Sequence, residues 1–156
     1  MSTSTRQLAA EICAPRPGDY ARMAELAGQL GYPSTAQEIG RRLDRMQASG
    51  DNAVFVAQLS TGELVGWIAV FLYCCVETDV RAEVSGLVVD ERQRSNGIGQ
   101  RLLERAEDWA REKGCRTIGL RSNVIRGRAH AFYERQGYEN FKTQKSFRKS
   151  LKSPGQ

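Results

Sequence analysis

The sequence predicts a mixed α/β domain of the α+β type, in which a mostly antiparallel central sheet is flanked by helices. Two observations lead to this prediction. Strand-like segments rich in Val, Ile and aromatic residues follow one another through the middle of the chain and are joined by a tight turn, which is typical of antiparallel pairs. A long amphipathic segment then separates two further strands, which indicates a parallel crossover. At 156 residues we expect a single domain, residues 1–156, with a core over about 9–151.

The first third of the chain predicts one strand and two helices. Ala9–Ala14 reads as a short strand that ends at a Pro-rich turn. Apolar residues at helical spacing predict a helix over Tyr20–Leu30. Thr35 and Glu38 have the spacing of a capping box, and the helix that follows them should run to about Ala48.

Three strands come next. Asn52–Leu59 and Leu64–Tyr73 are rich in Val, Ile and aromatic residues, and a Ser-Thr-Gly-Glu turn joins them as a hairpin. Ala82–Val89 is the third strand, and it runs directly into a turn that contains two glycines. This order predicts an antiparallel meander.

The rest of the chain predicts a crossover, a second helix and a strand-forming tail. Gly97–Lys113 has apolar residues at helical spacing, and Thr117–Arg121 is a short strand after it. A helix over Arg128–Arg135 ends before a glycine. Asn140–Leu151 reads as a final strand or pair of strands.

The turn before the 97–113 helix is the feature that says most about function. Backbone N–H groups at a helix N-terminus lack intrahelical partners, and glycine lets an anion approach them. The turn lacks the Lys of a Walker motif, and Leu102 stands where a dinucleotide fingerprint requires its third Gly or Ala. The residues that would face a phosphate group are Arg94, Ser95, Asn96, Gly97, Ile98, Gly99 and Gln100.

In this region the chain resembles the GNAT superfamily of acyl-CoA-dependent N-acetyltransferases. The family signature is [Arg/Gln]-x-x-Gly-x-[Gly/Ala] directly after an apolar strand, and the segment from Arg94 to Gly99 matches it in order and spacing. A second block, Arg128–Tyr138, resembles the later helix of the family, where a Gly-[Phe/Tyr] pair closes the helix four residues after a Tyr. The likeness covers roughly residues 9–151.

The resemblance implies a GNAT fold, in which the sheet splays between its fourth and fifth strands, and acetyl-CoA as the acetyl donor. Its pyrophosphate would lie on the N–H groups from Ser95 to Gln100, with Arg94 adding charge-assisted hydrogen bonds. The backbone of the donor-side strand, Leu87, Val88 and Val89, would pair with the pantetheine amides like a neighbouring strand.

One position departs from the family pattern. Members often have an Asn seven residues before the Tyr, in contact with pantetheine, and here that residue is Arg126. Asn123 could take over the contact, and Arg126 could reach a phosphate.

The resemblance also suggests the catalytic groups. Glu83 matches the placement of a general-base glutamate, and Tyr133 matches the tyrosine that donates to the departing sulfur. Their alternatives are a solvent-facing glutamate at a strand end and a core aromatic side chain. His130 is explained equally well by CoA contact, exposure or packing.

Charge is divided unevenly along the chain. Residues 1–91 hold 7 Lys/Arg against 12 Asp/Glu, a net charge of −5, and residues 92–156 hold 16 against 6, a net charge of +10. This suits a polyanionic donor and a cationic acceptor, although unequal surfaces alone would also explain it. We expect a primary amine of a small cationic molecule or peptide: an aminoglycoside, polyamine, amino-acid derivative, protein N-terminus or lysine. The groups expected near it are Asp19, Glu25, Tyr32, Tyr73, Glu77 and Asp79.

Two other function classes remain open at this point. A non-catalytic CoA-binding or regulatory module would keep the same fold. Nucleic-acid binding would use the basic half, but its aromatic residues lie at core-like positions and form no stacking array, so we expect no nucleic-acid partner.

Composition limits the remaining possibilities. Cys13, Cys74, Cys75 and Cys115 lack metal-ligand spacing, so we expect buried, reduced thiols and no metal. No apolar run approaches a membrane span and the N-terminus lacks a signal-peptide core, so we expect a cytoplasmic protein without a membrane partner. Family members are often homodimers through C-terminal strands, a role that Phe141–Leu151 could fill.

Overall fold

The computed structural model describes residues 9–94, 96–122 and 127–153. The chain forms two compact units, the first ending at Arg121 and the second beginning at Ser122. The first unit carries the sheet, and the second carries one helix and the C-terminal tail.

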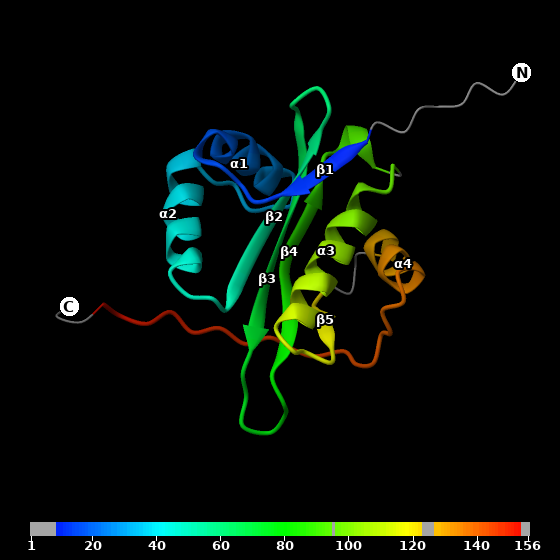
Figure 1. Cartoon of the computed structure of the whole chain (residues 1–156). Helices are drawn as coiled ribbons and strands as arrows, with labels where there is room; N and C mark the ends of the chain where they lie inside the picture. Colours follow the sequence, from blue (N-terminus) through cyan, green and yellow to red (C-terminus); the bar gives the residue numbers. More distant parts are fainter. Residues whose placement is uncertain (1–8, 95, 123–126, 154–156) are drawn as a thin grey trace, which may run out of the picture. The chain divides into compact units, whose positions relative to one another are not determined.

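Within the described residues, the first unit consists of a five-stranded mixed sheet and three α-helices (Figure 1). The sheet has the order β1-β2-β3-β4-β5, with β4 and β5 parallel and the other neighbours antiparallel. The predicted fold class is therefore confirmed. The strands are β1 (Ala10–Cys13), β2 (Asn52–Leu59), β3 (Leu64–Tyr73), β4 (Arg81–Val89) and β5 (Ile118–Leu120). The helices are α1 (Tyr20–Gln29), α2 (Ala36–Gln47) and α3 (Ile98–Glu112), and the 3₁₀ turns are η1 (Pro17–Asp19) and η2 (Glu91–Gln93).

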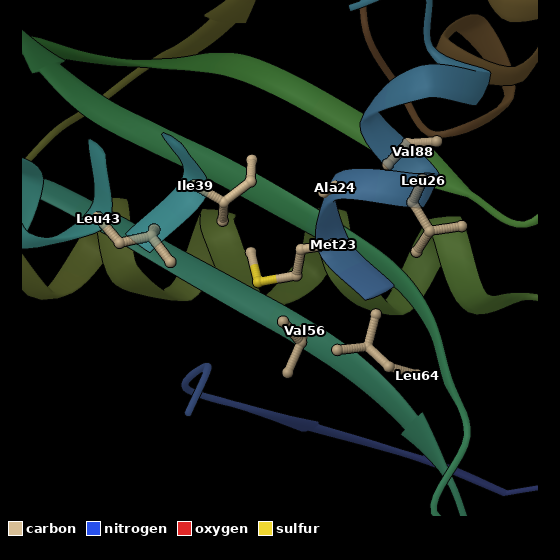
Figure 2. Packing of buried hydrophobic residues seen from close by; sticks show 8 residues of the cluster. All are labelled: Met23, Ala24, Leu26, Ile39, Leu43, Val56, Leu64 and Val88. Atoms are coloured by element: carbon tan, nitrogen blue, oxygen red, sulfur yellow. The ribbon is translucent and has the colours of Figure 1, made fainter. Parts of the chain in front are cut away.

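Helices cover both faces of this sheet. α1 and α2 lie on one face, and α3 lies on the other (Figure 1). Each helix is amphipathic and turns its apolar side toward the strands, which removes that surface from water. Figure 2 shows the core between the α1/α2 layer and the sheet, made of Met23, Ala24, Leu26, Ile39, Leu43, Val56, Leu64 and Val88.

The start of α2 is the local feature that the sequence predicted most closely. The Thr35 hydroxyl accepts a hydrogen bond from the backbone N–H of Glu38, and the Glu38 carboxylate accepts one from the backbone N–H of Thr35, both at 3.1 Å. These two bonds satisfy N–H groups that the first helical turn leaves without partners. The capping box is therefore confirmed.

The second unit contains α4 (Gly127–Arg135), which ends before Gly137 at a φ of +90°. The prediction of one or two strands over Asn140–Leu151 is wrong, because no described residue of that segment is in a strand. Phe141, Phe147 and Leu151 would share one face of an extended chain, but Thr143, Lys145 and Lys149 lie between them on that face, so it is not continuously apolar. Phe147 is accordingly 92% exposed. The expected dimer contact through C-terminal strands therefore cannot use a strand of this segment, because the described residues form none.

Candidate functional site

Strand β4 loses its parallel partner part-way along. β5 faces only the first part of β4, where Ala82 to Val84 pair with Ile118 to Leu120. From Gly86 to Val89 the strand still pairs with β3, but no described strand pairs with its other edge. The splay between the fourth and fifth strands is therefore present.

A β-bulge lies at the point of separation. The register between β3 and β4 shifts between Ala69 and Val70, which leaves Ser85 as the extra residue. A bulge bends its strand and increases the local twist, and this one lies directly after the last residue of β4 that pairs with β5. Gly86 follows the bulge, and a Cβ there would lie 2.9 Å from the Trp67 ring. Glycine thus lets the indole pack directly over the bent strand.

The unpaired edge of β4 presents backbone groups in alternation. The N–H of Asp90 donates to the carbonyl oxygen of Val65 in β3 at 2.8 Å. Because neighbouring residues of a strand direct their backbone groups to opposite sides, Val88 also faces β3, whereas Leu87 and Val89 face the free edge. Two residues of the predicted pantetheine-binding strand therefore offer N–H and C=O groups to a ligand.

The turn after β4 ends in a helix start that suits an anion. Gly97 is the N-cap of α3 with a φ of +77°, a left-handed conformation that costs other residues free energy. The N–H of Arg101 donates to the carbonyl oxygen of Gly97 at 3.1 Å and begins the helical ladder. The N–H groups of Ile98, Gly99 and Gln100 precede that bond, and they lie at the positive end of the helix dipole.

The side chains of the turn are mostly exposed. The Arg94 guanidinium lies 3.9 Å from the Glu91 carboxylate, and the Asn96 amide donates to Gln93 at 3.2 Å. Ile98 is buried and anchors the first turn of α3 to the core. Ser95, Asn123 and Arg126, which the sequence also suggested as CoA contacts, lie outside the described residues.

A buried carboxylate holds the beginning of this turn. Asp90 is only 2% exposed and its Oδ2 lies 2.5 Å from Arg22 of α1 and 3.2 Å from Arg92. Its Oδ1 accepts from the backbone N–H of Arg92 at 3.2 Å, and Gln29 of α1 accepts from the N–H of Glu91 at 3.1 Å. The turn is therefore fixed to α1 by side chains from two positions on that helix.

These contacts determine the ionisation of Asp90. Burial alone would raise the pKa of this carboxyl, but the hydrogen bonds from Arg92, Arg22 and Gln29 outweigh that effect and lower its pKa to about 2. Asp90 is therefore charged at neutral pH, and it helps to hold α1 and the turn together.

Glu83 lies at the other end of β4, in the part that β5 still covers. It stands opposite Phe71 of β3 and Gly119 of β5, and its side chain is 13% exposed. Its Oε1 is 3.9 Å from a guanidinium nitrogen of Arg81, which precedes it by two residues on the same face. The carboxylate is thus partly buried beside one cation, next to the place where the sheet opens.

Several groups that were expected to attract a cationic acceptor are engaged within the chain. The Asp19 carboxylate accepts from the backbone N–H of Arg16 at 2.8 Å, and Glu25 pairs with Arg22 at 3.0 Å. The guanidinium of Arg81 lies over the Tyr73 ring, 4.3 Å from the ring centroid. Exposed groups in the same region are Tyr32, Glu77 and Asp79.

Tyr133 lies on α4 in the second unit, within a small aromatic cluster. Its ring centroid is 5.4 Å from that of Phe132 and 6.2 Å from that of Tyr138, the latter in an edge-on arrangement. The N–H of Tyr138 donates to the carbonyl oxygen of Tyr133 at 3.0 Å. These contacts orient the ring within its own unit. His130, on the same helix, is half-buried.

The four cysteines are free thiols, but the expectation that they are buried is wrong. Cys74 is exposed and the other three are half-buried, because Cys13 ends the edge strand β1, Cys74 and Cys75 follow the end of β3, and Cys115 lies in the connection between α3 and β5. Among the described residues, no group of three His, Cys, Asp or Glu could hold a metal ion. In the described part of the chain, no helix combines the length and the apolar character that crossing a membrane requires.

Sequence reasoning missed Asp90, Arg22 and Arg81. A signal for Asp90 was available, since an acidic residue that directly ends an apolar strand is in a position to be buried. Arg22 and Arg81 had no such signal, because their partners lie far along the chain or depend on which face of a strand they occupy.

Comparison with known proteins now identifies the family. A profile described as the acetyltransferase (GNAT) family matches residues 21–138. The chain belongs to the GNAT acetyltransferase family. Two of the curated relatives whose names state an acceptor are the following. Over 139 residues it is 30% identical to an aminoglycoside N(6')-acetyltransferase type 1 from Stenotrophomonas maltophilia, covering 86% of this chain and 90% of that protein. Over 89 residues it is 35% identical to an aminoalkylphosphonate N-acetyltransferase from Salmonella typhimurium, covering 56% and 58%.

A solved GNAT structure shares the fold. The structure of AAC(6')-Iy in complex with the bisubstrate analogue CoA-S-monomethyl-acetylneamine superposes with a TM-score of 0.80 at 16% identity, over 92% of this chain and 99% of that one. GNAT enzymes use acetyl-CoA as the acetyl donor. The open edge of β4 and the helix start after it are consistent with binding of this donor.

Proposed function

We propose that this GNAT protein transfers the acetyl group of acetyl-CoA to the positively charged primary amine of a small molecule or peptide, with Glu83 as general base and Tyr133 as general acid. The observation that carries the proposal is the layout of β4. Glu83 stands in the last paired part of the strand, next to its bulge, and the backbone edge and anion-binding turn follow on the same strand. Acceptor chemistry and donor binding would thus meet where the sheet opens.

Donor binding would use mainly backbone groups. Leu87 and Val89 would pair with the amides of the pantetheine arm, and the N–H groups of Ile98, Gly99 and Gln100 would receive the pyrophosphate. Arg94 would add charge. Bound acetyl-CoA supplies an acetyl group activated as a thioester. We include both units in one catalytic domain, because the family match spans residues 21–138 and Tyr133 lies in the second unit.

The chain's own side chains would move the protons. Glu83 would accept a proton from the substrate ammonium, directly or through a water, and leave a neutral amine. As the nitrogen–carbon bond forms and the carbon–sulfur bond breaks, the Tyr133 hydroxyl would give its proton to the sulfur. One of the N–H groups at the free edge near Val89 would hydrogen-bond the carbonyl oxygen that gains charge.

The proposal is tested by the release of CoA thiol from acetyl-CoA in the presence of separate amines: an aminoglycoside, a polyamine, an aminoalkylphosphonate and a peptide with a free N-terminus. We expect acceptor-dependent release with at least one of them, above the rate without acceptor. Calorimetric binding of CoA, without thiol release for any amine, would instead indicate a non-catalytic CoA-binding module.

A further inference from the structure

The face of the sheet around Glu83 carries a fixed positive charge that a general base for amine acetylation does not need. Arg81 lies on β4 two residues before Glu83 and on the same face. Its side chain is 29% exposed, so a ligand can reach it. Any acceptor whose amine approaches Glu83 from this face meets a guanidinium beside the carboxylate.

Neighbouring side chains hold this guanidinium in place. It stacks on the Tyr73 ring at 4.3 Å, and its NH1 donates to the Thr78 hydroxyl at 3.2 Å and lies 3.8 Å from the Cys75 sulfur. Its NH2 lies 3.9 Å from Glu83, which is an ion-pair distance and longer than a hydrogen bond. Ordering the side chain in advance lowers the entropy cost of binding an anion there.

Arg81 also lines a hollow that has more basic than acidic residues around it. Its volume is about 560 Å³, and it lies between the β3–β4 connection and the segment before β5. Its lining residues include two arginines, Arg81 and Arg116, and one acidic residue, Asp79. Arg81 therefore belongs both to the ion pair with Glu83 and to a space that can hold a ligand group.

We propose that Arg81 selects acceptors that carry an anionic group, such as a phosphonate or a carboxylate, a few bonds from the reacting amine. This inference rests on the proposed function of Glu83 and narrows its acceptor. Arg81 would repel a molecule that carries only positive charges. A molecule with both an ammonium and an anionic group could instead place the ammonium at Glu83 and the anion at Arg81. An anion on Arg81 would also draw the guanidinium from Glu83 and leave that carboxylate available for the ammonium proton.

The test compares matched acceptors. 2-Aminoethylphosphonate and β-alanine carry an anionic group beside the amine, and 2-aminoethanol carries an uncharged hydroxyl in its place. For the wild-type protein we expect kcat/KM for at least one anionic acceptor to exceed that for 2-aminoethanol by about tenfold or more, the scale of a charge-assisted hydrogen bond. In Arg81→Gln this ratio should fall to near one, and Arg81→Lys should keep part of it, because lysine retains the charge without the planar fork.

Arg111→Gln is the matched control, since Arg111 pairs with Asp108 on the surface of α3; it should leave the ratio unchanged. A wild-type ratio near one, or a ratio that survives in Arg81→Gln, overturns the inference while acetyl transfer to other amines still stands. If no amine is acetylated, the proposed function fails, and calorimetric titration of 2-aminoethylphosphonate in the presence of CoA decides about Arg81. Binding that weakens about tenfold in Arg81→Gln supports the anion site, and equal or absent binding overturns it.

Discussion

At its Val89 end, strand β4 exposes backbone groups, and at its Arg81 end it exposes side chains. The Val89 end continues into the start of α3, where the first N–H groups precede the first helical hydrogen bond. The buried ion pair between Asp90 and Arg22 fixes the residues between this strand end and the helix. The Arg81 end carries a carboxylate and a guanidinium on one face, above Phe71 and Tyr73 of β3.

The difference teaches which half of the activity a sequence can reveal. Backbone groups are available only where glycine, strand and helix start follow one another in a fixed order, so a donor site of this kind leaves a motif. Side chains on a strand face can change one at a time without altering the fold, so the acceptor site leaves no pattern.

The largest effect should come from the acceptor end. Glu83→Gln keeps the size of the side chain but removes its basicity, so kcat should fall about a hundredfold or more, within the range of a general base. KM for acetyl-CoA should change little, because the donor end is untouched. Steady-state thiol release measures both parameters. Glu11→Gln is the matched control, because Glu11 is an exposed strand glutamate on β1. If Glu83→Gln and Glu11→Gln turn over alike, Glu83 is not the base.

Behind the donor end, Asp90→Asn should weaken the fold. Because the pKa of Asp90 in the folded protein is about 2, below its ordinary 3.8, its charge stabilises the protein by about 2 to 3 kcal/mol at neutral pH, roughly sixtyfold in the unfolding equilibrium. Asp108→Asn, which breaks an exposed pair with Arg111, should cost less than about 1 kcal/mol. Urea unfolding at pH 7 measures both.

The same substitution has a pH signature. A carboxyl whose pKa is lowered by folding contributes its full stability above the ordinary pKa of 3.8, and loses it as the pH falls toward 2. The stability of the wild type and of Asp90→Asn should therefore converge in that window. A gap that is as large at pH 2.5 as at pH 7 would show that the substitution acts through packing instead of charge.

These residues also show where sequence reasoning reaches its limit. The α2 capping box and the β2 and β3 strands were predictable, because each depends on neighbours within a few positions. The Asp90–Arg22 pair spans 68 positions, so only the folded chain reveals it. The tail from Asn140 was misread because its Phe residues have strand propensity, whereas a strand also needs a partner and an apolar face.

Tyr133→Phe tests a side chain that the sequence suggested by family resemblance. Removing the hydroxyl should lower kcat tenfold or more, the low end of a general acid's contribution, while the ring can keep its contacts with Phe132 and Tyr138. Tyr20→Phe provides the comparison, because the Tyr20 ring packs against Gly40 of α2 in a structural role. If Tyr133→Phe and Tyr20→Phe release CoA thiol at the same rate, Tyr133 is not the general acid.

The smallest effect should come from a backbone substitution at the donor end. Gly97→Ala places a Cβ on a residue at a φ of +77°, where it would meet no atom of a more distant described residue within 4 Å, so the substitution acts through backbone strain of about 1 to 2 kcal/mol. Part of that strain should be relieved by reorienting the N–H groups of the turn, and KM for acetyl-CoA should rise about threefold to fivefold with little change in kcat. Gly62→Ala is matched to it, because Gly62 has a φ of +89°, is equally unobstructed and lies in the β2–β3 turn. Both variants should lose similar stability in urea, but only Gly97→Ala should bind the donor more weakly. If both raise KM alike, the effect is one of general stability, and the backbone of this turn does not hold the donor.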